Sequence, residues 1–241
     1  AFKNVEIKKT TVGIGKIEKA LEEYILFGGF PEVVLSENNT DKIRLISSYF
    51  KDILGLDVAE VSRENISTVE TFGKYIIESP YFSASKCLDY FKTLGYKVGK
   101  QSLLDLEKYS ELGYLFFFIQ IFSRNIKDKK QYPRKAYLGD TGFMNAITGK
   151  LNMGRLYENV VLLELKRRMN LIQEINYWKN QEGMECDFIV HQGSNIKQLI
   201  QVCYDLSDEK TKNREVNGLV ACAKEFGLKG GLILTKDYEA E

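Results

Sequence analysis

The chain has 241 residues, of which 44% are hydrophobic and 28% are charged, and it contains only 3 prolines. This composition excludes a mainly disordered chain, and the length is enough for two ordinary globular domains. Lys and Arg number 34 against 33 Asp and Glu, so the net charge of +1 excludes a uniformly basic nucleic-acid binder and an acidic protein. The longest apolar run, residues 114–122, is about half of the roughly 20 residues that a membrane helix needs. We therefore expect a soluble, cytoplasmic chain without a membrane partner.

Cysteine and histidine are too few and too scattered for a zinc site of the usual type. The four cysteines form no CxxC pair, and His191 is the only histidine. We expect buried, reduced thiols. Catalysis by a Ser/His or Cys/His couple would depend on that one imidazole, at the end of an apolar strand pattern.

In the first part of the chain, helical spacing of apolar residues alternates with glycine stops. The pattern predicts helices over residues 17–27, 40–57, 68–79, 84–94 and 99–112, with Ser83 as an N-cap and Gly95 and Gly113 as stops. The aromatic and β-branched run 114–122 predicts a strand, followed by a turn and a short return strand 135–138. Helix, turn, helix and β-hairpin is the order of a winged helix.

The pattern changes after Gly149. It predicts a helix over residues 155–169, strands over 174–179, 185–191 and 197–204, a helix over 208–226 and a last strand over 231–235. This order is typical of an α/β sandwich with a mixed sheet. We place a domain boundary near Lys150.

Three polar residues of this second part predict a candidate site. Glu158 extends the apolar stripe of its helix and should face the sheet. Strand alternation places Asp187 on one face together with Glu185 and Ile189, and Gln201 lies on the next strand. Glu158 and Asp187 could bind Mg²⁺ or Mn²⁺ weakly, with Gln201 as a further oxygen donor. The alternative is that Glu158 forms only local contacts and Asp187 is a strand-edge charge.

These residues resemble a known family. The helix with Glu158 and the strands with residues 185–190 and 199–203 look like the PD-(D/E)XK nuclease fold. The motifs at residues 28–32 (GGFPE), 137–142 (YLGDTG), 157–159 (YEN) and 177–180 (YWKN) resemble the region that follows the AAA+ module in a large family of prokaryotic ATPases. The resemblance implies an α+β chain in three parts. Residues 1–39 end an ATPase module expected upstream of Ala1, 40–150 form a winged-helix domain, and 151–241 form a three-layer restriction-endonuclease-like α/β domain with a mixed sheet.

Two departures from this family argue against nuclease activity and against ATP binding by this chain. The nuclease pattern has acid-x-Lys on its third strand, where this chain has Gln201 and Cys203, and a thiol does not replace a fixed ammonium. Lys179, Lys210 or Lys212 could supply a migrated lysine, and Glu185 a second acid. A P-loop is missing, because the nearest string, at residues 13–17, lacks the first glycine and the hydroxyl. We expect no ATP site, no certain cofactor and a remnant catalytic site of Glu158, Asp187 and Gln201.

The winged-helix part carries a local positive charge. Residues 80–135 contain eleven Lys and Arg and five acids, 11 − 5 = +6. The residues expected to contact DNA phosphates are Lys97, Lys100, Arg124, Lys127, Lys129 and Lys130. Against this, the predicted recognition helix carries Asp105, Glu107 and Glu111, which would repel DNA unless they point away. The favoured function is a double-stranded-DNA-binding and interaction region of an AAA+-type ATPase. A working Mg²⁺-dependent nuclease and a protein-interaction scaffold remain as alternatives.

Overall fold

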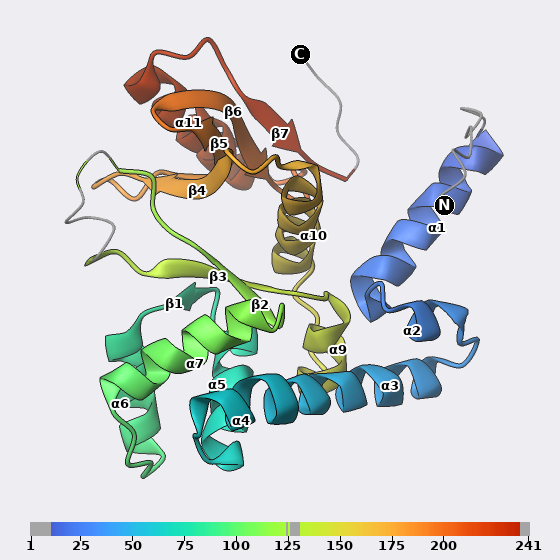
Figure 1. The fold of residues 1–241 in the computed structure, drawn as a ribbon. Coiled ribbons are helices and arrows are strands. Elements are labelled where there is room, and N and C mark those ends of the chain that lie inside the picture. Colours follow the sequence, from blue (N-terminus) through green and yellow to red (C-terminus); the bar gives the residue numbers. More distant parts are fainter. Residues whose placement is uncertain (1–10, 124, 126–130, 237–241) are drawn as a thin grey trace.

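The computed structural model describes residues 11–123, 125 and 131–236, and within them it has an α+β fold with two sheets (Figure 1). The first half contains mostly helices and a small sheet. Its elements are α1 (Thr11–Phe27), α2 (Pro31–Leu35), α3 (Asn39–Asp52), the π-helix η1 (Ile53–Ala59), α4 (Glu60–Ser62), α5 (Ile66–Glu78), β1 (Tyr81–Phe82), α6 (Ala84–Thr93), α7 (Lys100–Leu112), β2 (Phe116–Ile119), β3 (Arg134–Leu138) and α9 (Gly142–Thr148).

The second half is a three-layer unit. Its elements are α10 (Met153–Arg168), β4 (Glu174–Lys179), β5 (Glu185–Gln192), β6 (Asn195–Val202), α11 (Glu209–Phe226) and β7 (Leu232–Leu234). The sheet has the order β4-β5-β6-β7, antiparallel except for the parallel pair β6 and β7, so the predicted mixed sheet is confirmed. Leu162 of α10 packs on one face of this sheet and Leu219 of α11 on the other.

The small sheet of the first half has the order β1-β3-β2, with β3 antiparallel to both neighbours. The predicted strand over residues 114–122 is too long. Tyr114 has a left-handed backbone (φ 54°), which delays the start of β2, and the chain leaves β3 after Ile119. Ile121 then bridges to Tyr177 of β4, so this segment extends the second sheet.

Capping explains several helix ends. The side chains of Asn38, Asn65, Asn152 and Asp208 each accept a hydrogen bond from a backbone N–H in the first turn of α3, α5, α10 and α11. Ser83 lies at the N-cap of α6 as predicted, but its hydroxyl makes no capping bond. The helix predicted to end at Asp57 continues through η1 and α4 to Ser62, where Arg63 has a left-handed backbone.

The two halves share a hydrophobic core. Phe117, Ile119 and Tyr137 of the first half pack in one cluster with Tyr177 and Phe188 of the second. In addition, the Arg155 guanidinium of α10 donates to backbone carbonyl oxygens at the end of α5, and burial lowers its pKa to about 10. The division into domains at residue 150 therefore stays a prediction. In the described part of the chain, no helix is long and apolar enough to cross a membrane.

Candidate functional site

A buried lysine at the junction of the two halves is surrounded by three carboxylates. Lys135 belongs to β3 and is 5% exposed. Its Nζ lies 2.7 Å from Asp187 Oδ1, 3.0 Å from Glu158 Oε1 and 2.6 Å from Glu185 Oε1. We call Lys135, Glu158, Glu185 and Asp187 the Lys135 cluster. The structure thus brings together two residues of the predicted site, Glu158 and Asp187, around a cation from the other half of the chain.

A β-bulge places Asp187 in this cluster. The register between β4 and β5 shifts between Asn176 and Trp178, so that Asp187 and Phe188 together lie opposite Tyr177. Strict alternation, which grouped Asp187 with Ile189, is therefore wrong here. Ile189 packs in the core on the α11 face, whereas Asp187 shares the ammonium with Glu158 of α10.

Strands β5 and β6 separate next to the bulge, and side chains bridge them. The last paired residues are Phe188 and Ile200. Beyond them, Asp187 Oδ2 accepts a hydrogen bond from the Val202 N–H (2.8 Å), and Gln201 Oε1 accepts one from the Asp187 N–H (3.1 Å). The Gln201 amide also donates to Glu215. Gln201 therefore holds the backbone of the site in place, and its carbonyl oxygen is already used.

Hydroxyl groups and a second lysine complete the cluster. The Tyr137 O–H donates to Glu158 Oε1 (2.6 Å), and the Tyr81 O–H donates to Glu185 (2.7 Å). Lys179 Nζ lies 3.1 Å from Glu185 Oε2. Three carboxylates face two ammonium groups, so the ionised cluster keeps one net negative charge.

Burial and charge shift the pKa values in opposite directions. Burial raises the pKa of Asp187 to about 6, against the lowering effect of the Lys135 ammonium. Burial disfavours the charge of Lys135, but Asp187 and Glu158 more than offset this and raise its pKa well above the usual value. For Glu185, burial acts to raise the pKa, but Lys135 and the hydrogen bonds lower it overall. Lys135 is therefore charged, and Asp187 binds a proton more readily than Glu185.

The cluster does not fit a divalent metal ion. Mg²⁺ requires close to six oxygen ligands at about 2.1 Å, whereas oxygens of all three carboxylates contact the ammonium of Lys135. Within the residues that the structure describes, no group of three or more His, Cys, Asp or Glu side chains could hold a metal. The Cys203 thiol is 3.1 Å from the Asp205 carbonyl oxygen and supplies no cation. A hollow of about 620 Å³ borders the cluster, lined among others by Glu185, Asp187 and Gln201.

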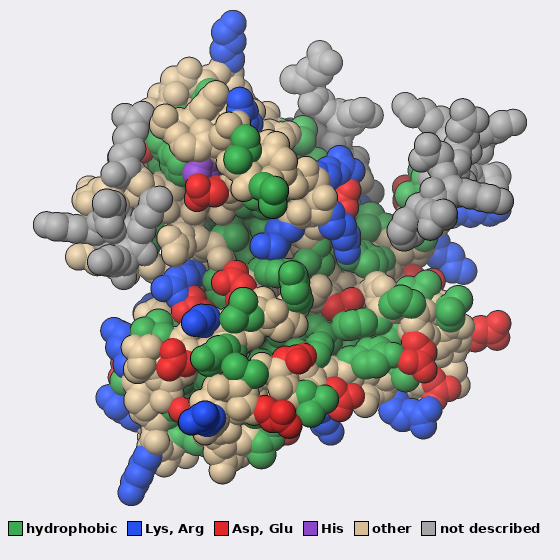
Figure 2. All heavy atoms as spheres, viewed as in Figure 1, with side chains coloured by type: hydrophobic (Ala, Val, Ile, Leu, Met, Phe, Trp, Pro, Cys, Tyr) green, Lys and Arg blue, Asp and Glu red, His purple; other side chains and the backbone are tan. Residues whose placement is uncertain are grey.

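The residues predicted to contact DNA are only partly described. Lys97 and Lys100 are exposed, and Lys100 Nζ lies 3.1 Å from the Ser85 hydroxyl. Arg124, Lys127, Lys129 and Lys130 lie outside the described residues. Figure 2 shows basic and acidic side chains interspersed over the visible face. Two of the eleven bases counted in the sequence, Arg134 and Lys135, are engaged with buried acids, so the positive charge available to a partner is smaller than predicted.

Of the three acids of α7 named above, only Glu107 is buried. Glu107 is buried and forms an ion pair with Arg134. Glu111 accepts a hydrogen bond from the Phe118 N–H (3.3 Å), and Asp105 accepts one from the Gln101 amide (3.0 Å). Only the charge of Glu107 is therefore neutralised, and Asp105 and Glu111 would still repel DNA.

Two of the sequence motifs meet in space. Asp140 accepts hydrogen bonds from the Gly29 N–H (2.8 Å) and the Gly142 N–H (2.9 Å). Gly28 has a φ of 76°, and a Cβ there would lie 1.6 Å from Asp140 Oδ1. The Thr141 hydroxyl donates to the Tyr24 carbonyl oxygen. The end of α1 is thus fastened to the loop that follows β3.

The YEN motif holds β3 itself. The Asn159 side chain accepts a hydrogen bond from the Leu138 N–H (2.7 Å) and donates one to the Leu138 carbonyl oxygen (2.9 Å). Its amide thus makes the pair of backbone hydrogen bonds that a residue of an adjacent strand would make. Glu158 binds the two side chains of β3 that point the same way, Lys135 and Tyr137. Sequence reasoning missed Lys135, which it counted among the surface bases. The available signal was its period-two spacing from Tyr137 in a short apolar strand.

Comparison with known proteins gives families without an assigned activity. Residues 18–153 match the family model described as a domain of unknown function (DUF8612), and residues 153–241 match another domain of unknown function (DUF4143). The uncharacterised protein MJ1544 of Methanocaldococcus jannaschii is 32% identical over 232 residues, which cover 94% of this chain and 52% of the relative. The chain therefore spans about half the length of that relative. No solved structure gives a significant match.

Proposed function

We propose that this chain, which belongs to the DUF8612 family, is the DNA-binding and interaction region of an AAA+-type ATPase, and that its nuclease-like half has no catalytic activity. The observation that carries the loss of catalysis is the Lys135 ammonium among Glu158, Glu185 and Asp187. It takes the place where a hydrolytic site of this kind would need a metal ion.

The order and pairing of elements in the first half support a winged helix. Helix α5, strand β1, helices α6 and α7 and the hairpin of β2 and β3 follow one another, and β3 pairs between the other two strands. In this interpretation α7 is the recognition helix and the segment between β2 and β3 is the wing. The inward orientation of Glu107 and the exposure of Lys97 and Lys100 favour contact with phosphates.

The second half supports a nuclease-like ancestry. A helix with Glu158, the strand with Asp187 and the strand with Gln201 follow the order of the PD-(D/E)XK fold, and α10 and α11 cover opposite faces of a mixed sheet. The ATPase module is proposed from the resemblance of the four motifs. Regions of the DUF4143 type are common in ATPase-associated proteins, which agrees with this proposal.

The DNA-binding proposal is tested with a fluorescent 20-base-pair duplex, titrated over a series of salt concentrations. Replacing Lys97 and Lys100 with Ala should weaken binding similarly for unrelated sequences and reduce the salt slope by about one unit per lost contact. The exposed Lys51 of α3 provides the matched control, and Lys51→Ala should leave the slope unchanged. Lys127, Lys129 and Lys130 are tested together as a second variant.

An unchanged slope in both variants would support the scaffold alternative instead. The nuclease alternative has one observation in its favour, because Lys135 places an ammonium beside Glu158 and Asp187, as a migrated lysine would. Cleavage that requires Mg²⁺, and that is lost in Asp187→Asn, would establish that alternative and exclude the proposed loss of catalysis.

A further inference from the structure

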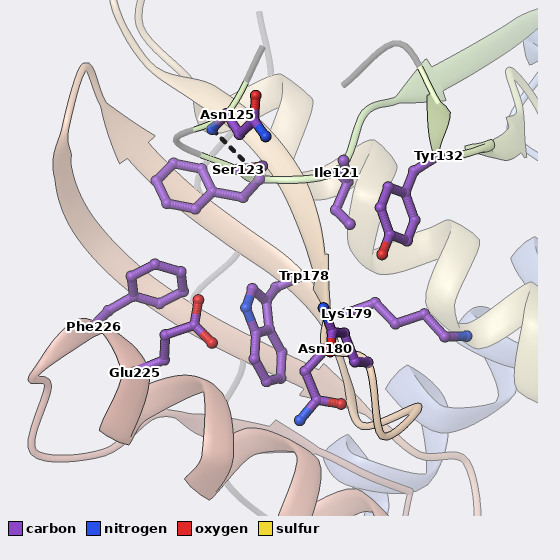
Figure 3. A pocket seen from close by; sticks show the side chains of 11 residues that line it. Ile121, Ser123, Asn125, Tyr132, Trp178, Lys179, Asn180, Glu225 and Phe226 are labelled. Carbon is purple, nitrogen blue, oxygen red and sulfur yellow. Dashed lines mark hydrogen bonds between the residues drawn. The ribbon is translucent and has the colours of Figure 1, made fainter. Parts of the chain in front are cut away.

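A pocket of about 430 Å³ lies between the two halves, on the side of the sheet that α11 covers (Figure 3). One wall is the chain on either side of the β2–β3 connection, with Phe122 and Tyr132. The other is formed by the end of β4, with Trp178, and the end of α11, with Glu225 and Phe226. A cavity of this size holds a ligand as large as a nucleotide.

Aromatic rings line the pocket and are held in place. The Phe122 and Phe226 ring centroids are 5.2 Å apart at an interplanar angle of 81°, and His191 packs edge-on against Phe122 at 4.7 Å. Figure 3 shows the Tyr132 ring on the other side of the Trp178 indole from Phe226. Fixed ring faces of this kind favour a flat, unsaturated ligand that can stack.

Polar groups at the pocket would select among such ligands. Trp178 is 3% exposed as a residue, and its indole N–H donates to none of the described residues. Because no fully buried side-chain nitrogen in this part of the chain lacks a partner, the indole nitrogen is accessible from the pocket and free to donate to a ligand. Figure 3 shows the Glu225 carboxylate on the same side of the indole as this nitrogen. The pocket therefore offers a donor and an acceptor beside stacking surfaces.

We propose that this pocket binds an unpaired base of a DNA strand. The proposal rests on the DNA-binding function proposed above. A base supplies the flat ring, an acceptor atom for the Trp178 N–H and an amino group for the Glu225 carboxylate. Adenine, cytosine and guanine carry such an amino group and thymine does not, so thymine should bind least well.

The test uses the fluorescence of Trp178, the only tryptophan of the chain. The full chain is titrated with the 12-nucleotide strands (dA)12, (dC)12 and (dT)12, and with a blunt 12-base-pair duplex. We expect (dA)12 and (dC)12 to change the emission with at least fivefold higher affinity than (dT)12, and the blunt duplex to change it little. Removing a stacking ring in Phe226→Ala should weaken (dC)12 binding about 5- to 100-fold.

Two further variants keep the result interpretable if Phe226→Ala fails to fold. Tyr132→Ala removes a half-exposed ring and should weaken (dC)12 binding, and Glu225→Gln should reduce the preference over (dT)12. The control is Lys229→Ala, at an exposed residue shortly after the end of α11, which should leave the affinity for (dC)12 unchanged. No emission change with any single strand, equal affinity in the ring variants, or a response to oligolysine instead of DNA would overturn the proposal. Binding of the duplex is measured separately by anisotropy. If the duplex binds but no single strand changes the Trp178 emission, the pocket proposal is refuted and the DNA-binding proposal is not.

Discussion

Replacing Lys135 with Met tests whether the buried ammonium holds the two halves together. Methionine keeps most of the length and volume of the side chain, so the main loss is the positive charge. Lys135 comes from β3, and its three carboxylate partners come from α10 and β5. The variant therefore leaves three acids of the second half facing an apolar group.

The expected cost follows from what each acid retains. Glu185 keeps Lys179 and the Tyr81 hydroxyl, and Glu158 keeps the Tyr137 hydroxyl. Asp187, with only 8% of its side chain exposed, loses its one charged partner. Removing one member of a buried ion pair costs about 3–5 kcal/mol, which is a large share of the roughly 5–15 kcal/mol that stabilise a typical native protein.

The assay is urea unfolding at pH 7.5, followed by circular dichroism. Lys135→Met should lower the free energy of unfolding by about 3–5 kcal/mol, and the exposed control Lys97→Met should change it by less than about 0.5 kcal/mol. The deficit should shrink at pH 5, because the acids can then bind protons. A loss below about 1 kcal/mol at pH 7.5 would refute the idea that this ammonium stabilises the junction.

Three other measurements test the site and its supports. Burial raises the pKa of Asp187 to about 6, so on lowering the pH its carboxyl binds a proton in the folded state before it does in the unfolded chain. The free energy of unfolding, measured relative to Asp187→Asn, should therefore fall by up to about 3 kcal/mol from pH 4 to pH 7. A rise would show that the attraction of Lys135 outweighs the effect of burial on this carboxyl. Gly28→Ala should lower the free energy of unfolding in urea by about 3 kcal/mol or more, because Gly28 has a φ of 76° and the new Cβ would clash with Asp140. The control Gly15→Ala adds a Cβ in open space on α1 and should leave this free energy unchanged or raise it. Finally, plasmid DNA incubated with the unaltered chain and 10 mM Mg²⁺ should show no cleavage above background, and cutting that disappears in Asp187→Asn would contradict the loss of catalysis.

The sequence predicted the regular elements better than the contacts between them. Glycine stops and apolar spacing located α7 and α11 to within about one residue, because these signals are local. The short helix α9 was missed, since seven residues from Gly142 to Thr148 give too few apolar repeats to distinguish them from a loop. The early end of β2 depends on the pairing of Ile121 with β4, which is non-local.

The same distinction applies to the candidate site. Glu158 and Asp187 were identifiable, because a carboxylate in an apolar stripe or strand is unusual. The bulge that turns Asp187 toward α10 depends on how β4 pairs with β5, and local alternation does not contain it. Lys135 lies 52 residues before Asp187, so only the tertiary fold reveals their contact.

The origin of the Lys135 cluster in both halves constrains how such proteins evolve. If the second half were recombined with an unrelated first half, Glu158, Glu185 and Asp187 would lose their principal counter-charge. Such a descendant would need another cation beside these three acids. We therefore expect a lysine at position 135 to be inherited together with the acids at positions 158, 185 and 187.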